Sequence, residues 1–111
     1  MKIVERPVGD VVILDLQGKV LFGESGAALS ETVARLAENG KKKILLNLAE
    51  VPYVDSAGLG EIVRCYTTVS RKGGRLKLIN LTKKIKDLLA ITKLLTVFET
   101  FDSEDEGVRS F

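Results

Sequence analysis

The 111-residue chain contains 17 Lys and Arg and 15 Asp and Glu, and 45% of its residues are hydrophobic. This length and composition predict a single soluble globular domain, and a net charge of +2 favours binding to neither nucleic acid nor a membrane. The chain has no His and only one Cys, Cys65, which excludes an internal disulfide, a Cys/His zinc site and a Ser-His-Asp triad. It starts at Met1 without an apolar stretch of signal-peptide or membrane-spanning length, so a cytoplasmic location is the default expectation.

The first part of the chain predicts a β-hairpin followed by a helix. Residues 2–6 and 11–16 have the composition of strands, and the turn-forming run Pro7-Val8-Gly9-Asp10 joins them. Ser25 is expected to cap a helix that ends at Asn39-Gly40. The apolar face of this helix would consist of Leu29, Val33, Leu36 and Ala37.

The middle of the chain predicts a buried strand over residues 44–48, followed by an amphipathic helix with apolar residues from Leu59 to Val69. Asp55 and Ser56 then lie where the exit loop of the strand becomes the first turn of the helix. Free N–H groups and the positive end of the helix dipole make this turn suitable for an anion.

Gly58 and Gly60 fall in the first turns of this predicted helix. A Gly inside a helix costs on the order of 1 kcal/mol relative to Ala. The pair therefore predicts either close packing of the helix start on its own sheet or close approach by another molecule.

The last third of the chain predicts a strand over residues 75–81, then a helix capped by Thr82, then a short edge strand over residues 97–101. The capping box Ser103–Glu106 would open a final helix through Val108 and Phe111, weakened by Gly107. The third helix would bury Ile85, Leu88 and Leu89. Lys83, Lys84 and Lys86 lie near its start, where the dipole disfavours cations, and predict a solvated face or an acidic partner.

After the hairpin, strands alternate with helices, which indicates parallel pairing with right-handed crossovers. The predicted fold is α/β: one domain over residues 1–111, with a mixed, mostly parallel sheet of four to five strands and about four helices. Asp55 and Ser56 would lie at the carboxyl end of a parallel strand, where open α/β sheets place their sites.

Catalysis is disfavoured by the residues around Ser56. The Gly-x-Ser-x-Gly pattern is absent, no His is available, and Asp55 is too weak a base for an alcohol. Gly58-Leu59-Gly60 supplies only half of a dinucleotide-binding Gly-x-Gly-x-x-G, since Val63 occupies the last position. Ser56 is either a helix cap or a modifiable serine whose phosphate would disrupt a docked partner while leaving the fold intact.

The run Val54-Asp55-Ser56-Ala57-Gly58-Leu59-Gly60, placed after the strand at residues 44–48, resembles the signature of the STAS domain. Within that superfamily it is most similar to the bacterial anti-sigma-factor antagonists. The similarity continues through Gly73-Gly74, the strand at residues 76–81 and the run from Leu88 to Phe101, and so covers nearly the whole chain.

The resemblance implies a non-catalytic partner switch with no cofactor or metal bound by this chain. In that family the unphosphorylated protein binds an anti-sigma factor that is also a serine kinase, and a sigma factor is released. The kinase phosphorylates the motif serine, which corresponds to Ser56, and a serine phosphatase of the metal-dependent type resets the switch. The free protein is expected to be a monomer that binds neither nucleic acid nor a membrane. The expected partner-binding residues are Asp55, Ser56, Ala57, Gly58, Leu59, Gly60, Glu61, Arg64, Leu21 and Phe22.

One segment departs from the family pattern. Many members carry Asp at the end of a Gly-x-Leu/Ile-Asp segment after the second strand, whereas here Gly18-Lys19-Val20 is followed by Leu21 and Phe22. These two apolar residues belong either to the core or to a more hydrophobic contact surface. The alternative functions are a STAS subunit of a lipid-transport complex, a scaffold for another signalling complex without phosphorylation of Ser56, and a serine hydrolase, which the missing base argues against.

Overall fold

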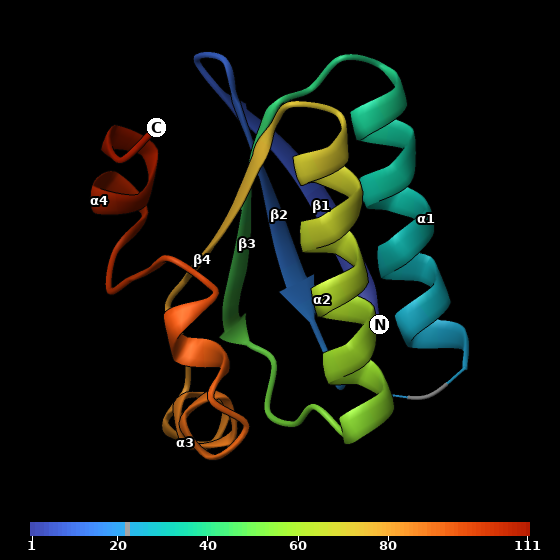
Figure 1. Cartoon of the computed structure of the whole chain (residues 1–111), viewed down its shortest axis with the longest axis vertical. Helices are drawn as coiled ribbons and strands as arrows, with labels where there is room; N and C mark the ends of the chain where they lie inside the picture. Colours follow the sequence, from blue (N-terminus) through green and yellow to red (C-terminus); the bar gives the residue numbers. More distant parts are fainter. Residues whose placement is uncertain (22) are drawn as a thin grey trace.

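The computed structural model describes residues 1–21 and 23–111, and its central feature is a sheet with the strand order β1-β2-β3-β4-β5 (Figure 1). The strands are β1 Lys2–Val8, β2 Val11–Gln17, β3 Lys43–Glu50, β4 Arg75–Ile79 and β5 Thr100–Phe101. The helices are α1 Glu24–Glu38, α2 Ser56–Arg71, α3 Lys83–Ile91, the 3-10 helix η1 Leu94–Thr96 and α4 Glu104–Arg109. Only β1 pairs antiparallel, so the predicted mixed, mostly parallel α/β sheet is confirmed.

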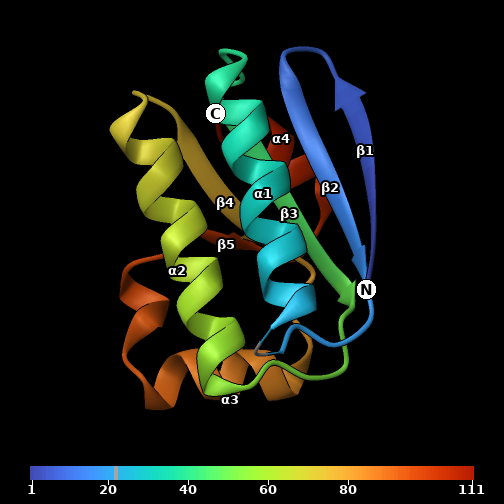
Figure 2. The same ribbon diagram turned by 90° about the vertical axis from the view of Figure 1, so that its right-hand side faces the viewer.

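Two layers of helices enclose the sheet. Helices α1 and α2 pack side by side on one face, and α4 covers the other (Figures 1 and 2). Helix α3 lies beyond the sheet, at the same end of the domain as the start of α2 (Figures 1 and 2). In the part of the chain that is described, no helix has the length and apolar character needed to cross a membrane.

The central strands are mainly apolar, with polar residues chiefly near their ends, because helices cover both of their faces. Alternate residues of β2, β3 and β4 point to the α1–α2 side, where they form the larger core. The residues between them form a smaller core under α4. The larger core includes Leu14, Leu16, Ile44, Leu46, Leu48, Leu76 and Leu78, and the smaller one consists of Val11, Ile13, Leu45 and Ile79.

The hairpin is tighter than predicted. Strand β1 continues through Val8, and Pro7 is paired with Val12, so the turn contains only Gly9 and Asp10. Gly9 has a φ of +61°, which glycine adopts without steric cost. The prediction of a four-residue turn was wrong because an edge strand tolerates a proline, whose missing N–H faces away from the sheet.

The predicted caps of α3 and α4 are confirmed, and that of α1 is wrong. The Thr82 and Ser103 hydroxyls accept hydrogen bonds from the N–H groups of Ile85, at 3.3 Å, and Glu106, at 3.2 Å. Ser25 instead lies inside the first turn of α1. Its Oγ accepts the N–H of Leu21 at 2.8 Å and donates to the carbonyl of the same residue at 3.2 Å.

The elements at the C-terminal end differ in length from the prediction. Strand β4 ends at Ile79 because Asn80 has a φ of +57°, and β5 begins only at Thr100. Helix α4 ends at Arg109, before Phe111. Gly107 serves close packing, since a Cβ there would lie 2.6 Å from Cγ2 of Ile79, so its cost to helix propensity is offset by contact with the sheet.

A cluster of charges ties β1 to β2 and α4. The Arg6 guanidinium pairs with Asp15 and, at 2.6 Å, with Glu104. The hydrogen bond from Arg6 lowers the pKa of Asp15 below its usual value, and a hydrogen bond from Asn47 lowers it further, against the opposing effect of burial. A carboxyl group whose pKa is lower in the folded chain stabilises the fold above its unfolded value of about 3.9.

The contribution of Asp15 should therefore disappear as the pH falls through its folded pKa. We expect Asp15→Asn to lower the free energy of unfolding by on the order of 1 kcal/mol at about pH 6, and by progressively less below about pH 3.9. Urea unfolding of both proteins between about pH 6 and about pH 2 measures this difference. A cost that does not change with pH would contradict the assignment.

Candidate functional site

The loop between β3 and α2 presents Ser56 at the carboxyl end of the parallel strands. Asp55 is the N-cap of α2, and its Oδ1 accepts the N–H of Gly58 at 2.6 Å. Ser56 is therefore not the cap, and its side chain is exposed, with no hydrogen-bond partner among the described residues. The possibility that Ser56 only caps the helix is thereby removed.

The segment that follows β2 fixes the position of the loop between β3 and α2. The segment after β2 forms a parallel bridge between Val20 and Val54. The N–H of Val20 donates to the carbonyl of Tyr53 at 3.0 Å, and the N–H of Asp55 donates to the carbonyl of Val20 at 3.2 Å. Leu21 follows directly, half-buried, and lines a shallow hollow with Met1 and other residues near the start of α1. The predicted contact residue Phe22 lies outside the described residues.

The two glycines of the motif have different surroundings. A Cβ on Gly58 would overlap the carbonyl oxygen of Val20 and lie 2.7 Å from its carbonyl carbon. A Cβ on Gly60 would meet nothing within 4 Å. Close packing on the domain itself therefore explains Gly58, whereas Gly60 leaves a patch of helix surface open to another molecule.

The motif residues fall into an exposed set and a buried set. Ser56, Ala57, Gly60 and Arg64 are exposed, whereas Gly58 and the side chain of Leu59 are buried under the helix start. The buried pair can position the loop, and the exposed residues are those that a partner can touch.

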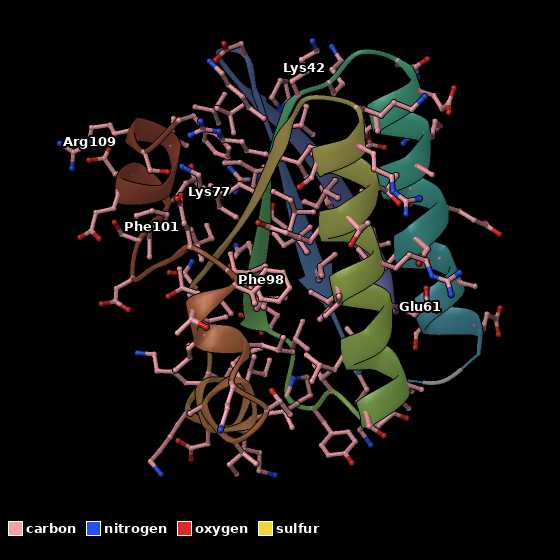
Figure 3. The ribbon with its side chains drawn as sticks, in the orientation of Figure 1. Lys42, Glu61, Lys77, Phe98, Phe101 and Arg109 are labelled. Carbon is pink, nitrogen blue, oxygen red and sulfur yellow. The ribbon has the colours of Figure 1, made fainter. Side chains whose placement is uncertain are left out.

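Glu61 joins the motif helix to α1. It is half-buried, it accepts a hydrogen bond from the hydroxyl of Ser30, and its Oε2 lies 3.9 Å from Nε of Arg64 (Figure 3). Ala57 and Glu61 line a hollow together with residues of α1, among them Ala27 and Glu31. These α1 residues were not predicted as part of the site, although their spacing of four places them on one exposed side of that helix.

On its other side, Ser56 faces α3. A hollow of about 260 Å³ lies between α3 and the residues 53–56 that lead into α2, here called the motif loop, and its lining includes Ser56 and Lys84. Its full lining is Tyr53, Val54, Asp55, Ser56, Lys84, Ile85 and Leu88. From the sequence, Lys84 was expected on a solvated face or near an acidic partner, and no sequence signal connects it with Ser56.

The cysteine of the chain lies in α2, nine residues after Ser56. Cys65 is 1% exposed, and burial raises the pKa of its thiol to about 12, so it lacks the thiolate needed for nucleophilic attack. The described residues contain no group of three or more His, Cys, Asp or Glu side chains that could hold a metal ion. What the site does present is the exposed hydroxyl of Ser56 beside the open helix surface at Gly60.

Comparison with known proteins agrees with this geometry. The STAS-domain family model matches residues 2–107. The anti-sigma-B factor antagonist of Bacillus subtilis (strain 168) is 35% identical over 85 residues, which cover 77% of each chain. The crystal structure of TM1081 from Thermotoga maritima has a TM-score of 0.90 at 28% identity and covers 97% of this chain and 92% of its own.

The phosphorylated form of the Bacillus protein SpoIIAA has the same fold, with a TM-score of 0.76 at 16% identity over 98% of both chains. The family match spans almost the entire sequence, and the B. subtilis relative exceeds 30% identity over most of it. The resemblance drawn from residues 54–60 is therefore confirmed, and the chain belongs to the STAS-domain family.

Proposed function

We propose that this domain is an anti-sigma-factor antagonist, which binds an anti-sigma factor through the surface around Ser56 and so frees a sigma factor. The observation that carries the proposal is the exposed hydroxyl of Ser56, which has no hydrogen-bond partner in residues 1–21 and 23–111, next to the open helix surface at Gly60. The names of the B. subtilis relative and of SpoIIAA, both anti-sigma factor antagonists, support it. In this proposal residues 1–111 act as one module, and the contact surface adds Ala57, Arg64 and the segment at Leu21.

Phosphorylation of Ser56 switches the module off. The anti-sigma factor acts as a serine kinase with ATP and magnesium in its own site. Oγ of Ser56 attacks the γ-phosphorus, the new O–P bond replaces the bond to ADP, and the hydroxyl proton passes to a base of the kinase. A metal-dependent serine phosphatase reverses the change by transferring the phosphoryl group to water, which restores the hydroxyl.

The phosphate acts on the interface while the fold is retained. It adds about −1.5 to −2 charges. The start of α2 tolerates them because free N–H groups and the helix dipole favour anions there. A partner that docks flat against Ser56 and Gly60 meets both the bulk and the charge, so the complex dissociates.

The proposal is tested with the dissociation constant of the complex with a kinase-type anti-sigma factor from the same organism. We expect Ser56→Ala to bind like the wild type, because the hydroxyl forms no hydrogen bond with any described residue of the domain that the substitution would remove. Ser56→Asp and phosphoserine at position 56 should weaken binding by about tenfold or more, since a desolvated charge in an interface costs several kcal/mol.

Ser70→Asp is the matched control, because it adds the same charge at an exposed position near the other end of α2. It should leave the affinity unchanged. Equal binding by wild type, Ser56→Asp and the phosphoserine form would overturn the switch and favour a constitutive scaffold.

A further inference from the structure

The hollow between the motif loop and α3 contains one feature that the proposed contact surface does not use. Figures 1 and 2 show α3 at the same end of the domain as the start of α2, although the two helices are separated in the sequence by β4. Ser56 and Asp55 line the hollow from the loop, and Lys84, Ile85 and Leu88 line it from α3. A hydroxyl and an ammonium group from distant parts of the chain thus share one small concave surface.

Lys84 differs from the other two lysines at the start of α3. Lys83 pairs with Asp87 at 3.3 Å, and Lys86 pairs with Asp102 at 3.7 Å. Among the described residues Lys84 has no ion-pair partner. Of the three, only Lys84 lines the hollow with Ser56.

The position of Lys84 in its own helix is unfavourable for its charge. It lies in the first turn of α3, where the helix dipole disfavours a positive charge, and it is exposed. The ammonium group of Lys84 therefore lies at the unfavourable end of the α3 dipole and has no carboxylate partner among the described residues. An anion that occupies the hollow in another state of the protein would explain this placement. The hydroxyl of Ser56 is the group in the hollow that gains such a charge on phosphorylation.

We propose that Lys84 is the intramolecular counter-ion of a phosphate on Ser56. This inference rests on the proposed function, because it concerns the phosphorylated state. The ion pair turns the phosphate toward α3. The positive charge of Lys84 stabilises the phosphate dianion, and the negative charge of Asp55 destabilises it. Besides Lys84, the titratable groups that line the hollow are Tyr53 and Asp55.

The second ionisation of the phosphate reports the contact, since its ordinary pKa is about 6. A nearby cation lowers this pKa by favouring the dianion. The measurement is a ³¹P NMR pH titration of the full chain with phosphoserine installed at position 56 during translation, in wild type, Lys84→Gln and Lys83→Gln. Each variant removes one positive charge at an exposed position of α3 and leaves the core untouched.

We expect Lys84→Gln to raise the phosphate pKa by on the order of 0.3 pH unit, and Lys83→Gln to change it by much less. Equal values for the two variants, or no change in Lys84→Gln, would overturn the proposal. The phosphoserine is installed without a kinase, so the titration gives a result even if no anti-sigma factor binds. Failure of the Lys84 assignment is thereby distinguishable from failure of the partner switch.

Discussion

Gly58→Ala is expected to lower the free energy of unfolding by about 3 kcal/mol, because the added methyl group has no space. It would overlap the carbonyl oxygen of Val20 and lie 3.2 Å from Oδ1 of Asp55. Both neighbours are fixed: Val20 by its backbone hydrogen bonds to Tyr53 and Asp55, and the Asp55 carboxylate by its bond to the N–H of Gly58. The start of α2 must therefore shift as a unit, or the bridge between the two loops must break.

Gly60→Ala provides the matched control, in the same turn of the same helix. Its Cβ would meet no atom within 4 Å, so only helix propensity changes. We expect the substitution to raise the free energy of unfolding by up to about 1 kcal/mol. Urea unfolding followed by circular dichroism measures both variants. If Gly58→Ala changed the free energy of unfolding by the same amount as Gly60→Ala, the loop at Val20 would be able to yield, and Gly58 would not be required by packing.

These two glycines show where sequence analysis of the motif reaches its limit. The positions of Asp55 and Ser56 at a strand-to-helix junction could be predicted, because an apolar strand and a 3.6-residue helical repeat meet there. The two explanations for Gly58 and Gly60 could not be assigned from the sequence. What separates them is the approach of Val20, which is distant in the chain and has no local signal.

The same limitation applies to both hollows beside the motif. The cap and the buried face of α3 were predicted, because Thr82 is a typical capping residue and the spacing of Ile85 and Leu89 is that of one helix face. Its placement against the motif loop depends on tertiary packing, so the proximity of Lys84 to Ser56 could not be predicted. The participation of Ala27 from α1 was missed for the same reason.

Residue preference also failed at two positions where nearby residues pair in a way that the residue type does not indicate. Pro7 looked like a turn residue, yet the edge position of β1 lets it pair with Val12. Ser25 looked like a helix cap, but its hydroxyl bonds to Leu21. In both cases the partner is only four or five residues away, but the preference of the single residue type does not indicate which local arrangement forms.

Lys77 is a buried charge among the apolar side chains of β4, whereas the other charged residue of this strand, Arg75, is exposed. It is 3% exposed and lies on the face of β4 that α4 covers (Figure 3). Its Nζ donates to the carbonyl of Ser110 at 2.9 Å, pairs with Glu99 at 2.7 Å and lies 4.6 Å from the ring centroid of Phe111. One ammonium group thus holds the C-terminal segment against the sheet from several directions.

Lys77→Ala is expected to lower the free energy of unfolding by about 3 kcal/mol, because it removes both these polar contacts and the packing of the alkyl stem. Lys77→Met keeps most of the stem volume and lets the thioether contact the aromatic rings, so its cost should be about 1 kcal/mol. The decrease in the free energy of unfolding is limited in both variants, because the side chain of Glu99 is 60% exposed and becomes hydrated when Lys77 is removed.

Urea unfolding measures the two costs, and amide hydrogen exchange over Glu104–Arg109 shows whether α4 is released before the rest of the domain unfolds. Lys41→Ala is the control, since this lysine is exposed and forms no ion pair among the described residues. If Lys77→Met cost as much as Lys77→Ala, the ammonium contacts alone would hold α4, and the buried stem would contribute nothing. If neither variant accelerated exchange in α4, the aromatic contacts of Phe101 and Phe111 would be sufficient to retain it.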